Sequence, residues 1–428
     1  MEKTYKVKKA EKKSIVVDIP GSKSISNRAL IIAVQGKGET LLKNMLFSDD
    51  TRYMIKALEQ LGNKLIVNEE EKTVKVIPNE EKIWEECELF VGNAGTAMRF
   101  LPTYIASGTG TVIITGIERM KERPIRDLVD ALRQLEVEVE YLEKDGFPPI
   151  KVKANGLKGG TVKIKGDKSS QYITSILLSA PSSKEGITIE IQGDLVSIPY
   201  VEITGLMMKD FGVDFENQDN KILKVKSADY IGRDYIVEGD CSSASYFFAM
   251  GALGNKVRLN NIKLDSIQGD IKFLDVLLDM GLKIVDKGAN FVEVEGDGNL
   301  RGIDVDMKHI SDTAQTLSVV SLFAKGKTTI RNVYNMRIKE TDRIRACYNE
   351  LTKLGAKVTE FEDGLCIEPL DKVEAYNRGV YIDTYDDHRM AMSFALAGLK
   401  VEDVIIKDPE CVSKTFPNYF DEFEKIYK

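Results

Sequence analysis

The sequence has few of the residues that form disulfide bonds or bind zinc. Its 428 residues include five cysteines and two histidines. The cysteines are scattered, odd in number and never spaced as CxxC, a pattern that argues against both a disulfide framework and a zinc site. We therefore expect a protein of a reducing compartment that needs no metal ion.

Long apolar runs and an excess of positive charge are also missing. No segment approaches the roughly 20 uninterrupted apolar residues needed to span a bilayer. Residues 1–20 are rich in Lys and Glu and lack the apolar core of a secretory signal. The formal net charge is -7, whereas general nucleic-acid and anionic-membrane binders usually carry a basic excess. We expect a cytoplasmic protein with no nucleic-acid or membrane partner.

The phosphate-binding motifs of nucleotide-dependent enzymes are absent as well. The chain has no GxxxxGK[ST] loop and no GxGxxG after a strand pattern. We therefore expect no cofactor. Because the whole chain is acidic, any anionic ligand must be met by cations that are concentrated locally.

What the chain does contain is one segment repeated six times. At 428 residues it is long for a single hydrophobic core, and about 150 residues per domain predicts two or three domains. Six loops of small polar residues each run into an apolar segment. They begin at Gly21, Gly92, Gly166, Gly239, His309 and Tyr385, so successive starts lie 71, 74, 73, 70 and 76 residues apart.

Each repeat also contains a second segment with the apolar period of an amphipathic helix. In the first repeat, β-type runs occur at 14–19, 40–45, 64–69 and 73–78. They surround the two helices, which predicts a βαβαββ repeat. The first helix of each repeat is apolar on nearly every face, as only a fully buried helix tolerates. We expect an α/β protein of two domains, each with three repeats around buried central helices and with sheets outside. The seam is predicted near residues 230–240.

The polar loop of each repeat precedes the N-terminus of a helix. Such a loop presents unpaired backbone N–H groups and the positive end of the helix dipole, which suits an anion. The stretch GNAGTAMRF (92–100) fits this description. Taken alone, it fits a capped helix with a surface Arg equally well.

Charged and polar residues gather on these rims. The cations are Lys23, Arg28, Arg99, Arg123, Lys339, Arg343, Arg389 and Lys414. The polar residues are Ser24, Asn93, Thr96, Ser169, Ser170, Gln171, Ser197, Tyr200 and Asn335, and the best placed acids are Asp49, Asp312 and Glu340. Arg side chains bind phosphate and carboxylate in a bidentate manner. The set predicts a ligand with several negative charges and several hydroxyls.

Nine motifs follow one another along these repeats. They are GSKSISNRAL, GNAGTAMR, RMKERPI, KSSQYITSILL, GDLVSIPYV, EGDCSSASYF, RIKETDRI, YDDHRMAM and KTFPNYF. As a set, from about residue 14 to the C-terminus, they resemble the 5-enolpyruvylshikimate-3-phosphate synthase family of the shikimate pathway. The resemblance implies the two-domain enolpyruvyl transferase fold, with one domain over 21–238 on the shikimate 3-phosphate side. The other domain would comprise 1–20 plus 239–428, with the active site in the interdomain cleft.

The resemblance further implies a reaction and its ligands. The enolpyruvyl group of phosphoenolpyruvate moves to the 5-hydroxyl of shikimate 3-phosphate, and phosphate leaves through a tetrahedral intermediate. Residues that match the family's shikimate 3-phosphate binders are Lys23, Ser24, Arg28, Ser169, Ser170, Gln171, Ser197, Tyr200, Asp312, Asn335 and Lys339. Those that match its phosphoenolpyruvate binders are Lys23, Asn93, Gly95, Arg99, Arg123, Gln171, Arg343, Arg389 and Lys414. With small molecules as its only implied partners, we expect a monomer.

This reaction needs two groups that handle protons, because the enol carbon gains a proton while the attacking hydroxyl loses one. Our hypothesis assigns the methyl proton to Glu340 and the hydroxyl proton to Asp312. Lys23 is a further proton-handling candidate, and His388 has a supporting catalytic role. The remaining acids beside motifs, interpreted as helix caps or orienting groups, are Asp240, Asp342 and Asp387.

Two other functions share parts of this pattern. UDP-N-acetylglucosamine enolpyruvyl transferases share the fold and the cosubstrate. They usually carry a reactive Cys in the loop that matches TGIERMKERP (115–124), where this chain has none. A non-catalytic anion-binding clamp on the same scaffold would keep the cations and lose the carboxylates, yet Asp312 and Glu340 are both present.

One departure from the family pattern follows Arg99. Many members have Pro at the next position, whereas Phe100 here removes a fixed φ and restores an N–H inside the helix. A small shift of Gly95 and Thr96 would follow. We hypothesise that catalysis is kept while sensitivity to glyphosate, which inhibits many members, is reduced.

Overall fold

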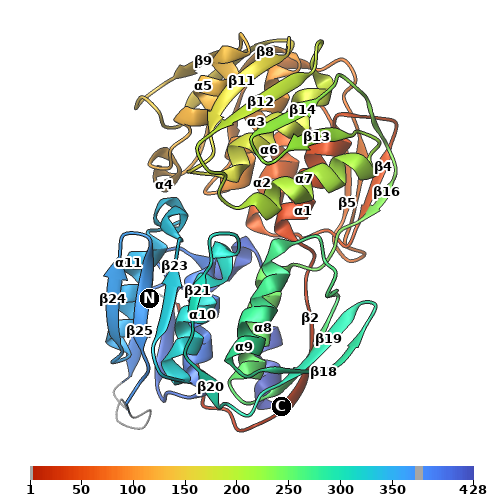
Figure 1. Ribbon diagram of the computed structural model, residues 1–428. Coiled ribbons are helices and arrows are strands. Elements are labelled where there is room, and N and C mark those ends of the chain that lie inside the picture. The colour runs from red at the N-terminus through yellow and green to blue at the C-terminus, as the bar shows by residue number, and fades with distance from the viewer. Residues whose placement is uncertain (1–2, 372–378) are drawn as a thin grey trace. The chain divides into compact units, whose positions relative to one another are not determined.

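The computed structural model describes residues 3–371 and 379–428. The chain divides into two compact units (Figure 1). Unit A is Gly21–Glu238, and unit B combines Met1–Pro20 with Gly239–Lys428. In the part of the chain that the structure describes, no helix has the length and apolar character that a membrane span requires.

Unit A is built around three helices. They are α1 (Lys23–Ala33), α3 (Gly95–Ala106) and α6 (Ser170–Ser179), which contact one another. Every residue of α3 is buried, and in α1 only the first two residues are partly exposed. The prediction that the apolar first helices are buried is confirmed. Because the sides of these helices are covered, only first-turn residues of α1 and α6 are left partly exposed to meet a ligand.

Outer helices and three sheets cover this core (Figure 1). The outer helices are α2 (Asp49–Gln60), α5 (Arg126–Gln134) and α7 (Ile198–Asp210), with a short α4 (Glu118–Lys121). The strand order of the first sheet is β16 (Asp234–Ile236), β4 (Thr40–Lys43), β6 (Thr73–Ile77), β5 (Lys64–Asn68). That of the second is β7 (Ile83–Phe90), β8 (Thr109–Thr115), β10 (Ile150–Asn155), β9 (Glu138–Tyr141). That of the third is β11 (Gly160–Lys165), β12 (Ile187–Gln192), β14 (Ile222–Val225), β13 (Phe215–Gln218). A two-stranded sheet pairs β3 (Gly36–Lys37) with β15 (Tyr230–Ile231). Each four-stranded sheet has one parallel pair followed by two antiparallel pairs.

Unit B repeats this plan. Its central helices are α8 (Cys241–Ala252), α10 (Ala314–Val320) and α12 (His388–Ala395), and its outer helices are α9 (Phe273–Met280), α11 (Arg343–Lys353) and α13 (Tyr419–Phe423). The strand order of its first large sheet is β18 (Lys283–Gly288), β19 (Phe291–Glu295), β17 (Lys256–Asn260), β2 (Ser14–Asp18). That of the second is β21 (Asp304–Asp306), β23 (Thr328–Arg331), β25 (Gly364–Glu368), β24 (Lys357–Phe361). That of the third is β1 (Thr4–Lys6), β27 (Val404–Lys407), β26 (Val380–Ile382). A small sheet pairs β20 (Leu300–Arg301) with β22 (Ala324–Lys325).

One predicted strand lies outside the repeat in which the sequence pattern places it. The run at 14–19 was expected in the first repeat, but β2 pairs in parallel with β17 of the fourth repeat, with Ser14 opposite Lys256. Its buried side chains, Ile15 and Val17, join the core of unit B. Strand β16 takes the corresponding place beside β4. The alternating pattern shows which face of a strand is buried, and it does not identify the neighbouring strand.

The sixth repeat also differs from the βαβαββ plan. Its sheet has three strands, and β1 from the N-terminal end pairs antiparallel with β27 there. The amphipathic segment of this repeat forms the short helix α13 between two 3-10 turns, at Pro409–Lys414 and Glu424–Tyr427. This repeat is therefore completed by residues from the opposite end of the sequence.

Buried hydroxyls join the central helices where their side chains meet. In unit B, Thr316 of α10 shares hydrogen bonds with Ser245 of α8 at 3.2 Å and with Ser393 of α12 at 3.3 Å. In unit A, Thr103 and Ser175 share one at 2.6 Å. Small polar residues in these apolar helices thus satisfy one another inside the core.

Candidate active site

In unit A, Arg28 is the most deeply buried of the predicted ligand-binding cations. Its guanidinium donates to the Thr204 hydroxyl at 2.9 Å and to the carbonyls of Ser24 and Tyr200 at 2.9 and 3.2 Å. The rings of Phe100 and Tyr200 lie 5.4 and 5.8 Å from it. Among the described residues no carboxylate forms an ion pair with Arg28, and burial lowers its pKa to about 10. A buried charge with only neutral partners favours an anionic ligand.

At the start of α1, Lys23 lies beside an acid. Its Nζ is 3.4 Å from the Oδ2 atom of Asp50, and both side chains are largely buried. The sequence pattern singled out Asp49, which is exposed, so the buried acid is its neighbour Asp50. The preceding Ser22 caps α1 by accepting from the Ile25 amide, and Ser24 in the first turn is half-buried.

The loop before α3 is held by an arginine from the next segment of its own repeat. Arg123 donates to the Asn93 carbonyl at 3.0 Å and to its Oδ1 atom at 2.9 Å. A Cβ on Gly95 would lie 2.6 Å from Arg123 Nη2, so a larger residue at this helix start would displace the Arg123 guanidinium from its present position. Arg99 is also buried and donates to the carbonyls of Gly95 and Pro124 at 3.3 and 3.1 Å. Asn93, Gly95, Arg99 and Arg123, all predicted phosphoenolpyruvate binders, therefore lie together.

The remaining predicted residues of unit A begin helices α6 and α7. Ser169 caps α6, where its hydroxyl accepts from the Gln171 amide at 3.3 Å, and Ser170 is buried beside it. Ser197 precedes α7 with a φ of 54°, in the left-handed region. Tyr200 lies one turn later and contacts Arg28. Serine is common at the start of a helix. The positions of these serines therefore do not by themselves indicate a ligand, and their binding of shikimate 3-phosphate stays a prediction.

In unit B, one carboxylate is surrounded by cations. Asp312, in the short 3-10 turn before α10, lies 2.8 Å from Arg389, 3.2 Å from Arg343 and 3.5 Å from Lys339. Nearby, Asn335 donates to the Ser311 hydroxyl at 3.0 Å. The structure thus brings the predicted residues of the fifth and sixth repeats into one cluster.

Arg343 is the centre of this cluster. Besides Asp312, its guanidinium meets Asp387 at 2.7 Å and Glu340 at 2.8 Å. Burial favours the neutral form of Arg343, but the three carboxylates outweigh burial and raise its pKa above the usual value. Every face of this guanidinium is therefore matched by negative charge.

The interpretation of Asp240, Asp342 and Asp387 as caps is confirmed, since each accepts a hydrogen bond from a backbone amide at a helix start. His388 is the first residue of α12, is buried, and has its Nδ1 atom 3.5 Å from Asp387. Lys414 is buried at the end of a 3-10 turn that packs on α12.

Asp270 is a buried acid that the sequence analysis missed. It accepts a hydrogen bond from the Ser242 hydroxyl of α8. Burial, and then the nearby Asp312, raise its pKa to about 6, against the opposing effect of Ser242. A repeat-position comparison would have found it, because Asp270 lies 31 residues after the start of its repeat, as do Arg123, Ser197 and Glu340.

Comparisons with known proteins agree with this geometry. The family model for EPSP synthase (3-phosphoshikimate 1-carboxyvinyltransferase) matches residues 7–423. Proteins named 3-phosphoshikimate 1-carboxyvinyltransferase from Mannheimia haemolytica and Sulfurovum sp. (strain NBC37-1) are 49% and 48% identical, over 96% of this chain and 96% of theirs. A solved EPSP synthase structure from Acinetobacter baumannii has a TM-score of 0.82 at 23% identity, covering 99% of this chain and 98% of that chain, which shows the fold. The chain belongs to the EPSP synthase (3-phosphoshikimate 1-carboxyvinyltransferase) family.

Proposed function

We propose that this protein transfers the enolpyruvyl group of phosphoenolpyruvate to the 5-hydroxyl of shikimate 3-phosphate and releases phosphate. The observation that carries the proposal is the cluster around Arg343, where Asp312 and Glu340 lie among cations. Anion binding needs only the cations, whereas proton transfer needs the carboxylates as well. The cluster therefore supports catalysis over a purely binding role.

The proposed steps assign one task to each acid. In the addition, the 5-hydroxyl oxygen bonds to the central carbon of phosphoenolpyruvate, Asp312 takes the hydroxyl proton, and Glu340 gives a proton to the terminal carbon. In the elimination, Glu340 takes a methyl proton back as the carbon–oxygen bond to phosphate breaks, and Asp312 returns its proton to the departing phosphate. Lys23 is a further proton-handling group. These steps are proton transfers and bond changes within the substrates, so the proposal includes no cofactor.

The ligand assignments divide between the units. In unit A, the proposed shikimate 3-phosphate contacts come from residues at the starts of α1, α6 and α7, with Arg28 as the buried cation. The Asn93 loop with Arg99 and Arg123 is proposed for phosphoenolpyruvate, together with Arg343, Arg389 and Lys414 of unit B. The proposal requires both units to act on the same two substrates. We further propose that the protein is a monomer and that it is located in the cytoplasm.

A coupled assay of phosphate release tests the proposal. With phosphoenolpyruvate and shikimate 3-phosphate, we expect turnover with one phosphate per acceptor consumed. With UDP-N-acetylglucosamine as acceptor we expect none, since residues 115–124 contain no Cys. Binding of both substrates without phosphate release would instead identify a clamp, and turnover of only the nucleotide sugar would overturn the proposal.

A further inference from the structure

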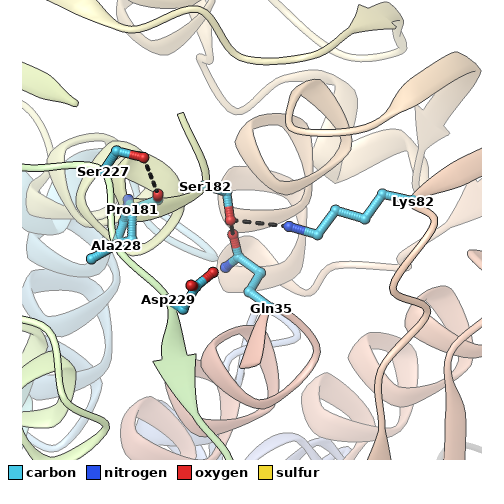
Figure 2. Close-up of a pocket in the computed structure, with 7 residues that line it drawn as sticks. All are labelled: Gln35, Lys82, Pro181, Ser182, Ser227, Ala228 and Asp229. Atoms are coloured by element: carbon cyan, nitrogen blue, oxygen red, sulfur yellow. Dashed lines mark hydrogen bonds between the residues drawn. The ribbon is translucent and has the colours of Figure 1, made fainter. Parts of the chain in front are cut away.

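A polar pocket lies in unit A, away from the helix starts. It has a volume of about 350 Å³, within the range of small-ligand pockets. Its lining residues are Gln35, Lys82, Pro181, Ser182, Ser227, Ala228 and Asp229 (Figure 2). Gln35 follows the C-terminal end of α1, so at 1.5 Å per residue it lies roughly 18 Å along the helix axis from Lys23. We call it the Lys82 pocket.

Lys82 is the unusual residue of this pocket. Its side chain is half-buried, and its Nζ donates one hydrogen bond, to the Ser182 hydroxyl at 3.0 Å. Among the described residues no carboxylate forms an ion pair with it. Burial lowers its pKa to about 8, with a smaller opposing effect from Asp229. The ammonium group thus keeps two N–H bonds for a ligand.

The other side-chain donors of the pocket are already in use. Ser182 donates to the Gln35 Oε1 atom at 3.0 Å, and Figure 2 shows its hydroxyl between Gln35 and Lys82. The Gln35 amide donates to the carbonyls of Ile31 and Leu178 at 2.9 and 3.1 Å. Ser227 donates to the Pro181 carbonyl at 3.5 Å. An acceptor on a ligand must therefore bind Lys82.

Asp229 supplies the complementary charge. Its Oδ2 atom pairs with Lys37 at 2.6 Å, in a bridge whose two side chains are mostly exposed, and its Oδ1 atom has no partner among the described residues. A dianion such as phosphate would be repelled by Asp229, and a simple amine would be repelled by Lys82. A ligand with one carboxylate and one ammonium meets both groups.

We propose that the Lys82 pocket binds a free α-amino acid as a zwitterion, with its carboxylate on Lys82 Nζ and its ammonium on Asp229 Oδ1. The lining includes only two apolar residues, Pro181 and Ala228. The pocket therefore takes an amino acid with a small or polar side chain rather than an aromatic one. The site is independent of the residues assigned to enolpyruvyl transfer.

Three small probes separate the parts of this recognition. In equilibrium dialysis of the full chain at pH 7, we expect labelled glycine to bind one site with a Kd of about 1 mM. Acetate, which lacks the ammonium, should bind at least about fivefold more weakly, and methylamine should not bind. Absence of saturable glycine binding up to about 10 mM, or equal affinities for glycine and acetate, would overturn the proposal.

Variants locate the binding. Lys82→Met keeps the length of the side chain and should weaken glycine binding by at least about tenfold. Asp229→Asn, at an exposed position, should reduce glycine affinity to that of acetate. Lys56→Met, at an exposed lysine of α2 in the same unit, should leave it unchanged. Equal binding by wild type and Lys82→Met would place the glycine elsewhere and overturn the proposal.

The pH dependence provides an independent readout. The charged groups that face Lys82 are Asp229 and, through it, Lys37. Because Lys82 must be protonated to hold a carboxylate, glycine affinity should fall about fourfold between pH 6.5 and 8.5. Lys82→Arg, whose charge does not titrate in this range, should bind without that dependence. A wild-type affinity that is flat over the range would contradict the assignment to Lys82.

Discussion

Arg28 of unit A and Arg343 of unit B are both buried arginines predicted to bind a ligand, and their surroundings are opposite. Arg28 has hydroxyls, carbonyls and aromatic rings around it and no carboxylate among the described residues. Arg343 meets three carboxylates, from Asp312, Glu340 and Asp387. Accordingly, the pKa of Arg28 is lowered and that of Arg343 is raised.

The difference indicates two ways of preparing a site for anions. Around Arg28, the fold keeps a positive charge unmatched, and a bound anion would supply the missing partner. Around Arg343, the charges are balanced without a ligand, so the carboxylates are fixed in place and available for proton transfer. The comparison assigns ligand binding to the surroundings of Arg28 and proton transfer to the surroundings of Arg343. Variants of each region test this assignment.

The largest effect is expected for Glu340→Gln. Gln keeps the shape of the side chain and still accepts from Arg343, which donates to Glu340 at 2.8 Å, but it cannot give or take a proton. We expect phosphate release to slow by about 10²–10⁴-fold with little change in KM. In D₂O, the variant should fail to incorporate deuterium into the methylene of phosphoenolpyruvate.

The matched control is Glu362→Gln, an exposed glutamate of the same repeat, which should retain wild-type turnover. Deuterium incorporation by Glu340→Gln at the wild-type rate would show that another group moves the methyl proton. In that case Asp312, or Lys23 with its neighbour Asp50, would become the next candidate.

Arg343→Met should have the largest effect on stability. It leaves Asp312, Glu340 and Asp387 close together without their shared cation, and breaking a buried network of this kind costs about 3–5 kcal/mol. Chemical denaturation followed by circular dichroism would measure the free energy of unfolding. Arg345→Met is the control on the same helix, because the Arg345 side chain is mostly exposed and its partner Glu360 keeps a second bridge to Arg337. We expect this variant to lose under about 1 kcal/mol. Similar losses in the two variants would show that the Arg343 network adds no stability.

Arg28→Met should give the reverse pattern. Removing a buried charge that has no acidic partner leaves no carboxylate behind, so the free energy of unfolding should change by less than about 1 kcal/mol. The KM for shikimate 3-phosphate should rise about 100-fold, since a buried charge-assisted contact to the ligand is lost. Steady-state kinetics and the same denaturation experiment measure the two effects. A loss of stability as large as that of Arg343→Met would break the comparison.

Much of the fold could be predicted because its signals are local. Apolar segments spaced by 70 to 76 residues predicted the central helices, and the structure buries them. Strand pairing could not be predicted in the same way. The pattern of β2 shows that Ile15 and Val17 are buried, but β17, its partner, lies more than 200 residues further along the chain.

Some residues of the candidate site could be predicted from the sequence, and others could not. Residues at helix starts, such as Gly95 and Asp387, follow from the repeat because position and role are linked there. Asp270 could have been found from its position in the repeat, but Asp50 was missed for a different reason. An acid in the first turn of a helix is common for its effect on the helix dipole, so the sequence gives no sign of which acid is buried. Only the packing distinguishes Asp50 from Asp49.

The charge balance of unit B also predicts a pH effect at Asp270. Its pKa is about 6 in the folded protein against an ordinary value of 3.8, so the folded state binds more protons and loses stability as the pH rises through this window. Asp270→Asn removes the buried charge and should raise the free energy of unfolding at pH 8 by on the order of 2 kcal/mol. At pH 4 the two proteins should be equally stable. Asp265→Asn, at an exposed position, should change neither value, and a constant difference at both pH values for Asp270→Asn would exclude titration as its cause.

The smallest effect is expected at Phe100, where the comparison depends on packing instead of charge. Its ring is buried 5.4 Å from the Arg28 guanidinium, and α3 already contains Pro102. Phe100→Pro would remove an N–H and fix φ within one turn of Gly95 and Thr96. We expect the inhibition constant for glyphosate to fall severalfold, by less than about tenfold, with turnover kept. Phe100→Leu keeps the N–H and removes the ring, so it should leave inhibition unchanged. If Leu and Pro lower the constant equally, the aromatic contact with Arg28 is the cause; if neither changes it, Phe100 only fills the core.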